Sequence, residues 1–277
     1  MKNYCYFNGK ITTLDKVKIS PYDIGLLRGY GVFDVMCTAN GKPFLFDAHW
    51  KRFQNSAMEL NLKVPINKST FKETIAKLLK LNGFEKANIR TVLSGGASHN
   101  GFAHERGRET FFILIENFSS LPGDVFQKGA GVMTIAHDRD FPLAKITNYA
   151  VAIKNQKQKE RKKSLEIIYV KDGKALEAST SNFFIVKKNK LITTKDKILV
   201  GTTRNVIIML AKKKGMMVEE RSILEKELYA ADEVFLTATN KDVVPVVRID
   251  GRKVGDGKVG KNTKIVMELF GDFVKKY

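Results

Sequence analysis

Apolar residues recur along the chain with two different periods, and each period predicts a different kind of element. In residues 48–60 and 67–84 they repeat every three to four positions, which predicts two amphipathic helices. The same period predicts two further helices in the second half, at residues 202–215 and 258–277.

Strands are predicted where apolar residues alternate with polar ones or form short uninterrupted runs. Residues 87–96 and 110–118 are such runs in the first half, and residues 233–240, EVFLTATN, form another in the second. Residues 164–194 divide into several short strands, with a turn at Asp172-Gly173.

Small and flexible residues mark where these elements begin, turn and end. Asn8-Gly9 and Asn40-Gly41 are hairpin turn pairs between short strands. Asp47 is expected to cap the helix that follows it, and Gly83 to end the next helix. This mixture of strand-rich and helical segments predicts an α+β protein.

The best candidate for a linker is SSLPGD, which begins at Ser119 and combines Pro and Gly with small polar residues. We therefore predict a small N-terminal α/β domain at residues 1–118, a linker at 119–123 and a larger C-terminal domain at 124–277. The smaller domain is expected to carry the substrate pocket and subunit contacts.

Composition narrows the class of protein. The chain has 277 residues and two cysteines, without a CxxC pair, so neither a disulfide framework nor a metal site is expected. The first residues hold no long apolar run typical of a signal peptide, and no run is long enough to span a bilayer. We expect a cytoplasmic protein that does not contact a membrane.

The net charge of +19 raises nucleic-acid binding as an alternative function. However, the basic runs at residues 159–163, 187–190 and 212–214 are separated along the chain and hold no interleaved aromatic residues. A lysine-rich composition spread over solvated faces explains them more simply, so we expect no nucleic-acid partner.

Candidate chemistry gathers at the ends of the predicted strands. Lys145 stands three residues before an Asn-Tyr pair, and Glu177 precedes the hydroxyl cluster Ser179, Thr180 and Ser181. Gly201-Thr202-Thr203 directly precedes a helix, where N–H groups, hydroxyls and the helix dipole favour a phosphate dianion. Thr239 is a further strand-end hydroxyl, and Arg52 is a possible fork for phosphate oxygens.

One lysine, one carboxylate and several phosphate ligands are the groups that pyridoxal 5′-phosphate (PLP) needs. Each piece alone has a simpler explanation: a solvated lysine, a strand-edge carboxylate, a helix start or a solvated arginine. The order and joint occurrence of the pieces carry the argument.

The ordered motifs resemble the fold-type IV PLP enzymes, the class IV aminotransferases. GLLRGYGVFD resembles the family's Gly-x-Gly-Val-Phe-Glu strand, with Asp34 where Glu is usual; HWKRFQNSA resembles its His-x-x-Arg helix, and AKITNY its Lys-x-x-Asn-Tyr segment. LEASTSNFF, ILVGTTR and TATNKDVVPV follow in the family's order. The resemblance implies a two-domain fold whose C-terminal domain has a barrel-like β core.

The resemblance also implies a role for each candidate residue. Lys145 would form the Schiff base with PLP and move a proton in a ping-pong transamination. Tyr149 would bind the phenolic oxygen of the cofactor, Glu177 its pyridine nitrogen, and Leu199 its ring face. The phosphate ligands would be Arg52, Thr202, Thr203 and Thr239.

Substrate choice depends on two arginines. Arg28 and Arg90 resemble an arginine pair with which a subgroup of D-amino acid aminotransferases holds the substrate carboxylate. The simpler interpretation is an exposed loop residue for Arg28 and a strand-edge salt bridge for Arg90. Lys261 stands where branched-chain enzymes usually have Pro.

Three enzyme functions remain open. Transamination of D-amino acids such as D-alanine or D-glutamate with 2-oxoglutarate or pyruvate leads. Branched-chain L-amino acid transamination is second, and the aminodeoxychorismate lyase reaction is third. The family resemblance further implies a homodimer.

Overall fold

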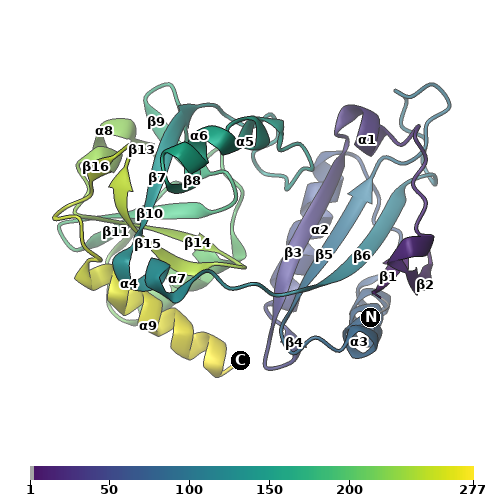
Figure 1. Ribbon diagram of the computed structural model, residues 1–277, viewed down its shortest axis with the longest axis horizontal. Coiled ribbons are helices and arrows are strands. Elements are labelled where there is room, and N and C mark those ends of the chain that lie inside the picture. The colour runs from purple at the N-terminus through teal and green to yellow at the C-terminus, as the bar shows by residue number, and fades with distance from the viewer. Residues whose placement is uncertain (1–2) are drawn as a thin grey trace. The chain divides into compact units, whose positions relative to one another are not determined.

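The computed structural model describes residues 3–277 and divides into two compact units, each built on its own sheet (Figure 1). The first unit runs to Ser119 and also includes Leu143–Tyr149, while the second consists of Ser120–Pro142 and Ala150–Tyr277. The sequence had assigned residues 143–149 to the C-terminal domain. They pack with the first unit because their backbone pairs with one of its strands.

A six-stranded antiparallel sheet forms the centre of the first unit, in the order β2-β1-β6-β5-β3-β4. Asn8-Gly9 and Asn40-Gly41 form its two tight turns with positive φ, which confirms both predicted hairpins. Its strands are β1 (Tyr4–Phe7), β2 (Lys10–Thr13), β3 (Gly31–Ala39), β4 (Lys42–Pro43), β5 (Ala87–Ser94) and β6 (Thr110–Asn117).

Two helices cover one face of this sheet, α2 (Phe46–Glu59) and α3 (Lys68–Asn82). Their buried side chains, such as Trp50 and Ile75, pack with Ile89 and Leu93 of β5 in one core. The short α1 (Ile24–Arg28) and a 3-10 turn, η1 (Leu14–Lys16), complete the unit.

The predicted start of α2 at an Asp47 cap is wrong. The helix begins two residues earlier than predicted, after Leu45 in the left-handed region, and buries Phe46. Asp47 lies in the first turn, where its carboxylate is 2.8 Å from the Lys68 ammonium. Burial of the aromatic ring therefore decides where the helix starts. The end of α3 at Gly83, with φ of 66°, is confirmed.

A ten-stranded sheet that curls around its own core forms the second unit, in the order β12-β11-β10-β14-β15-β7-β8-β9-β13, with β16 beside β15. This sheet is the barrel-like β core that the family resemblance implies. Its strands are β7 (Ala130–Ala136), β8 (Ser164–Lys171), β9 (Lys174–Ala178), β10 (Asn182–Lys187), β11 (Lys190–Thr193), β12 (Val218–Glu220), β13 (Ile223–Leu224), β14 (Glu233–Ala238), β15 (Asp242–Ile249) and β16 (Arg252–Lys253).

The helices of the second unit are α4 (Gly123–Lys128), α5 (Ala150–Lys154), α6 (Gln156–Arg161), α7 (Thr202–Lys213), α8 (Glu225–Tyr229) and α9 (Lys261–Lys275). A carboxylate from the sheet caps the last of them: Glu233 of β14 accepts from the N–H groups of Asn262 and Thr263 at 3.0 and 2.7 Å. A Cβ at Gly260 would lie 2.0 Å from the Glu233 side chain, so this cap requires glycine there.

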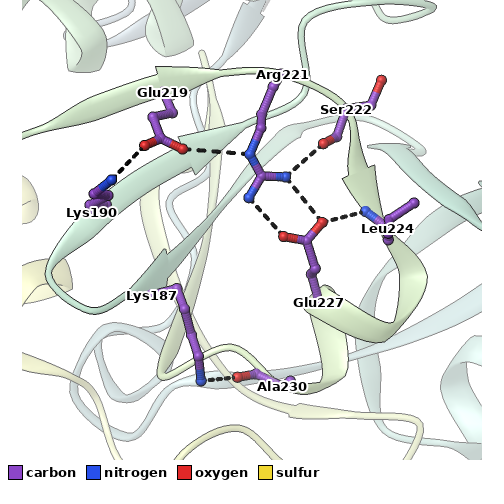
Figure 2. Close-up of polar contacts among 8 residues, drawn as sticks. All are labelled: Lys187, Lys190, Glu219, Arg221, Ser222, Leu224, Glu227 and Ala230. Atoms are coloured by element: carbon purple, nitrogen blue, oxygen red, sulfur yellow. Dashed lines mark hydrogen bonds and ion pairs between the residues drawn. The ribbon is translucent and has the colours of Figure 1, made fainter.

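Charged side chains join the short edge strands β12 and β13 to α8 (Figure 2). Arg221 lies between Glu219 and Glu227, and Glu227 also accepts from the N–H of Leu224 at 2.9 Å. These groups are partly exposed, so each ion pair contributes little alone. Across residues 3–277, no helix combines the length and the apolar character that a membrane span needs.

Candidate functional site

The segment that carries Lys145 runs beside β3 and is held by its backbone. The N–H of Phe33 donates to the Lys145 carbonyl and the N–H of Thr147 to the Gly31 carbonyl, both at 2.9 Å. The Lys145 N–H donates to the Ser56 hydroxyl at 3.0 Å. The position of this lysine along the strand is therefore fixed by hydrogen bonds on both of its sides.

The side chains of this segment alternate, as in a strand. Ala144 and Ile146 are buried in the core, which leaves Lys145 pointing the other way. Its Nζ lies 4.5 Å from the centre of the Phe33 ring, and the Tyr149 ring meets the same phenylalanine edge-on, with centroids 5.6 Å apart. Lys145 and Tyr149, chosen from the sequence, thus meet around one aromatic ring.

Arg90 lies on the same face of the sheet as Phe33. The register pairs Arg90 with Val35, and Val35 shares a face with Phe33 because alternate residues of a strand point the same way. The Arg90 guanidinium is 3.0 Å from the Glu116 carboxylate, and both side chains are more than a third exposed. The salt bridge expected under the simpler interpretation is present, on the face that carries Lys145.

Arg28 ends the short helix α1 at an exposed position. Its guanidinium carbon lies 5.8 Å from the centre of the Phe102 ring, and its Nη1 donates to the Leu27 carbonyl at 3.4 Å. Asp23 anchors the start of this helix: it is buried and accepts from Gly25, Ser94 and Thr110. The element that presents Arg28 is therefore tied firmly to β5 and β6.

Arg52 belongs to a buried polar cluster between α2 and β3. Its Nε and Nη2 donate to the two carboxylate oxygens of Asp34 at 2.7 and 3.0 Å. The Nδ1 of His49 lies 2.6 Å from the same carboxylate. The sequence predicted Arg52 to be a phosphate ligand but did not predict its contacts with Asp34 and His49.

In the second unit, Glu177 is a buried carboxylate whose partners include an arginine and a backbone N–H group. Arg139 donates to Glu177 through Nε at 2.8 Å, and the N–H of Leu199 donates to the other oxygen at 3.1 Å. The guanidinium compensates the negative charge that burial leaves without water. Sequence reasoning missed Arg139, because no local pattern links it to Glu177, which lies 38 positions later in the chain.

The start of α7 forms a cradle around a glycine. Thr202 and Thr203 are buried in its first turn, and the Thr202 hydroxyl is 3.5 Å from that of Thr239. A Cβ at Gly201 would lie 2.0 Å from the Asn182 side chain, so the backbone approaches more closely than any other residue permits. Such N–H groups and hydroxyls at a helix start fit a phosphate.

The strand beside this cradle carries an unused donor. Within residues 3–277, the buried hydroxyl of Thr237 makes no hydrogen bond. Thr237 pairs in register with Asn182, the residue that touches Gly201. A buried hydroxyl without a partner next to the cradle fits a site that receives a polar group.

The hydroxyl cluster after Glu177 serves a different carboxylate. Ser179 and Ser181 donate to buried Glu166 at 2.5 and 3.0 Å, and Thr180 donates to it as well. The Lys241 ammonium forms an ion pair with the same carboxylate. Sequence reasoning did not foresee this network, because its members are distant along the chain.

The residues chosen from the sequence therefore fall into two groups, each described within its own unit. The first unit holds Arg28, Arg52, Arg90, Lys145 and Tyr149. The second unit holds Glu177, Leu199, Thr202, Thr203 and Thr239.

Comparison with known proteins identifies the family. The sequence model of the amino-transferase class IV family matches residues 31–249, most of the chain. The chain belongs to the class IV aminotransferases. This class IV aminotransferase is 32% identical to a putative branched-chain-amino-acid aminotransferase of Methanocaldococcus jannaschii, over 98% of this chain and 96% of that protein. It is 28% identical to the D-alanine aminotransferase of Bacillus licheniformis, over 94% and 93% of the two chains.

The structure agrees with this membership. It superimposes with a TM-score of 0.91 on the crystal structure of the Escherichia coli branched-chain amino acid aminotransferase, at 26% identity, covering 100% of this chain and 96% of that one. The predicted fold-type IV architecture is confirmed, and the protein is a PLP-dependent aminotransferase.

Glu166 makes the stability of this class IV aminotransferase depend on pH. Burial acts to raise the pKa of Glu166, but the Lys241 charge and the hydroxyl donors lower it from 4.5 to about 2. Because the folded-state pKa is depressed, the stabilisation is complete above pH 4.5 and is lost as pH falls towards about 2. The difference corresponds to roughly 3 kcal/mol.

Urea unfolding of the wild type and of Lys241→Met between about pH 6 and about pH 2.5 measures this contribution. We expect Lys241→Met to lower the free energy of unfolding by about 3–5 kcal/mol at neutral pH, since it leaves the buried Glu166 carboxylate without a cationic partner. This deficit should shrink as pH falls, because a protonated Glu166 no longer needs that partner. Lys187→Met, which breaks the exposed pair with Asp232, is the control and loses at most about 1 kcal/mol. A deficit that stays constant across this pH range would contradict the assignment.

Proposed function

We propose that the protein transfers the amino group of a D-amino acid to a 2-oxo acid in the cytoplasm. The observation that carries the substrate proposal is the position of Arg90 on the sheet face of Phe33, around which Lys145 and Tyr149 meet. A guanidinium on that face is suited to grip the α-carboxylate of a substrate with two parallel hydrogen bonds.

PLP, when bound, supplies an electron sink that stabilises negative charge at the substrate Cα. Lys145 is the amine that holds the cofactor and then moves the proton of the substrate Cα. Tyr149 donates to the phenolic oxygen, and Leu199 packs against the ring. Glu177, backed by Arg139, keeps a proton on the pyridine nitrogen.

The cradle at Gly201 supports the assignment of the phosphate ligands. A dianion suits this site because backbone N–H groups at the start of α7 can donate to it. The hydroxyls of Thr202, Thr203 and Thr239 and the unused hydroxyl of Thr237 provide further donors. Arg52 adds a positive charge to this set of ligands in our proposal. The domain division at residues 119–123 remains part of the same proposal.

The Glu116 partner of Arg90 does not argue against a substrate role. Both side chains are more than a third exposed, so the pair stabilises the fold by about 1 kcal/mol at most. Displacing Glu116 from the guanidinium therefore costs a substrate carboxylate little. Arg28, from the neighbouring subunit of a dimer, would be the second carboxylate ligand.

Branched-chain L-amino acid transamination is the second candidate. It is favoured by the relative from Methanocaldococcus jannaschii and by the Escherichia coli branched-chain enzyme on which the structure superimposes. The lyase reaction is the least supported, since the relatives named above are aminotransferases.

Lys145 is tested by chemical labelling. Borohydride reduction of the PLP-loaded enzyme followed by peptide mapping is expected to place the pyridoxyl label on Lys145. Lys145→Ala is expected to abolish transamination, because the holding amine and the proton carrier are the same group. Lys154→Ala, on the exposed α5, is the control and keeps full activity. A label on any other lysine would contradict the assignment of Lys145 as the amine that holds the cofactor.

Arg90 is tested by comparing two variants of the same salt bridge. Arg90→Leu is expected to lower kcat/KM for D-alanine or D-glutamate by roughly 10- to 100-fold, since a charged hydrogen bond contributes about 1.5–3 kcal/mol. Glu116→Gln removes the partner but keeps the guanidinium, and should change kcat/KM less than about two-fold. Single-turnover rates with D-alanine, D-glutamate, L-leucine and L-isoleucine decide the stereochemistry. Faster conversion of the L-amino acids would move the enzyme to the branched-chain candidate.

Assembly is tested by sedimentation. Tyr22, Leu26 and Phe102 are 59, 71 and 75% exposed around Arg28, which supports a subunit contact there. We expect a particle of twice the 31.2 kDa chain mass. Leu26→Lys should shift it towards the monomer and lower activity, whereas Leu81→Lys on α3 should not. A fully active monomer would refute the dimer.

A further inference from the structure

Asp34 and His49 are among the most deeply buried ionisable groups of the first unit, with exposures of 1 and 0%, and the proposed reaction uses neither directly. His49 and Arg52 lie one turn apart on α2, so both side chains leave the helix on the same face. That face meets Asp34 on β3, where all three polar groups lie within hydrogen-bond distance. The cluster is compact, and these contacts converge on Asp34 and Arg52.

The charge states in this cluster follow from burial and from the neighbouring groups. Burial lowers the pKa of His49, so its ring is neutral at pH 7. Burial acts to raise the pKa of Asp34, but Arg52 and His49 hold it below its usual range, so the carboxylate is ionised. An ionised carboxylate has no proton to give, and therefore Nδ1 of His49 carries the hydrogen of their 2.6 Å contact.

Arg52 uses only one edge of its guanidinium within the protein. Nε and Nη2 donate to the two oxygens of Asp34, which is the side-on form of the arginine–carboxylate pair. Within residues 3–277, Nη1 of Arg52 donates to no acceptor. The side chain is only 12% exposed, so little water replaces a missing acceptor.

We propose that Asp34, oriented by His49, is a positioning residue that holds Arg52 so that the Nη1 edge of its guanidinium receives the phosphate of the cofactor. This inference rests on the proposed function, in which Arg52 is a phosphate ligand. Because the Asp34 carboxylate binds one edge of the guanidinium, it fixes the plane of that group. The Arg52 side chain then loses less rotamer freedom when a phosphate binds.

A purely structural role gives a different expectation. If the cluster only fastened α2 to β3, weakening it would lower stability and affect every ligand equally. A positioning role affects the phosphate alone. Pyridoxal, which has the ring and aldehyde of PLP but no phosphate, separates these two roles.

The experiment titrates the full-length protein with PLP and with pyridoxal and follows absorbance. Arg52→Leu is expected to raise the Kd for PLP by about 30- to 100-fold, and Asp34→Asn by about ten-fold, the range typical of losing a ligand or its supporting partner. The Kd for pyridoxal should change less than about two-fold in both. The double variant Asp34→Asn/Arg52→Leu should bind PLP no more weakly than Arg52→Leu alone, because Asp34 acts through Arg52.

Two further variants keep the test decisive. Asp34→Glu retains a carboxylate and should restore PLP binding to within about three-fold of the wild type. His49→Phe keeps a ring but removes the hydrogen bond to Asp34; it should weaken PLP a few-fold without affecting pyridoxal, and it replaces Asp34→Asn if that variant does not fold.

Equal weakening of PLP and pyridoxal by Asp34→Asn or His49→Phe, or effects of Asp34→Asn and Arg52→Leu that add, would overturn the positioning role. If Arg52→Leu leaves the preference for PLP over pyridoxal unchanged, Arg52 is not a phosphate ligand and the inference falls. A cofactor spectrum retained on Lys145 in that variant would leave the proposed reaction standing.

Discussion

The position of Lys145 depends on a few backbone hydrogen bonds between residues 143–149 and β3. The bonds to Phe33 and Gly31 fix the register of the segment, and period-two alternation then sends Ala144 and Ile146 into the core and the lysine away from it. A shift by one residue would bury Lys145 and expose its neighbours. The orientation of Lys145 is thus set by the same burial of apolar side chains that stabilises the unit.

Three of the buried carboxylates described above have a cationic partner that is distant along the chain. Arg52 of α2 compensates Asp34 of β3, Arg139 compensates Glu177, and Lys241 compensates Glu166. A buried charge without a partner is strongly destabilising, so each pair joins two segments whose relative placement matters. The exposed ion pairs around Arg221 have no such consequence, because water already stabilises their charges.

Much of the fold could be predicted from local signals. The hairpin turns at Asn8-Gly9 and Asn40-Gly41 and the end of α3 at Gly83 follow from backbone preferences that each residue carries alone. The ordered motifs predicted the family and therefore the fold-type IV architecture. The roles of the individual residues in the cofactor site remain predictions.

The features of the structure that could not be predicted from the sequence depend on contacts between side chains or segments that local patterns do not show. The start of α2 was wrong because burial of Phe46 outweighs the capping preference of Asp47. The hydroxyl cluster that begins at Ser179 was read beside Glu177, yet it serves Glu166, thirteen residues earlier. No local pattern shows that Arg139 reaches Glu177 across 38 positions, or that residues 143–149 pair with β3.

The membership of residues 143–149 in the first unit also has a consequence for biosynthesis. A chain leaving the ribosome has completed all six strands of the first sheet at Asn117, but the segment that pairs with β3 is not made until Tyr149. During that interval Gly31, Phe33 and the core around Val32 lack the partners that they have in the finished protein. Lys145 is therefore also among the last residues needed to complete the first unit, most of which is synthesised earlier.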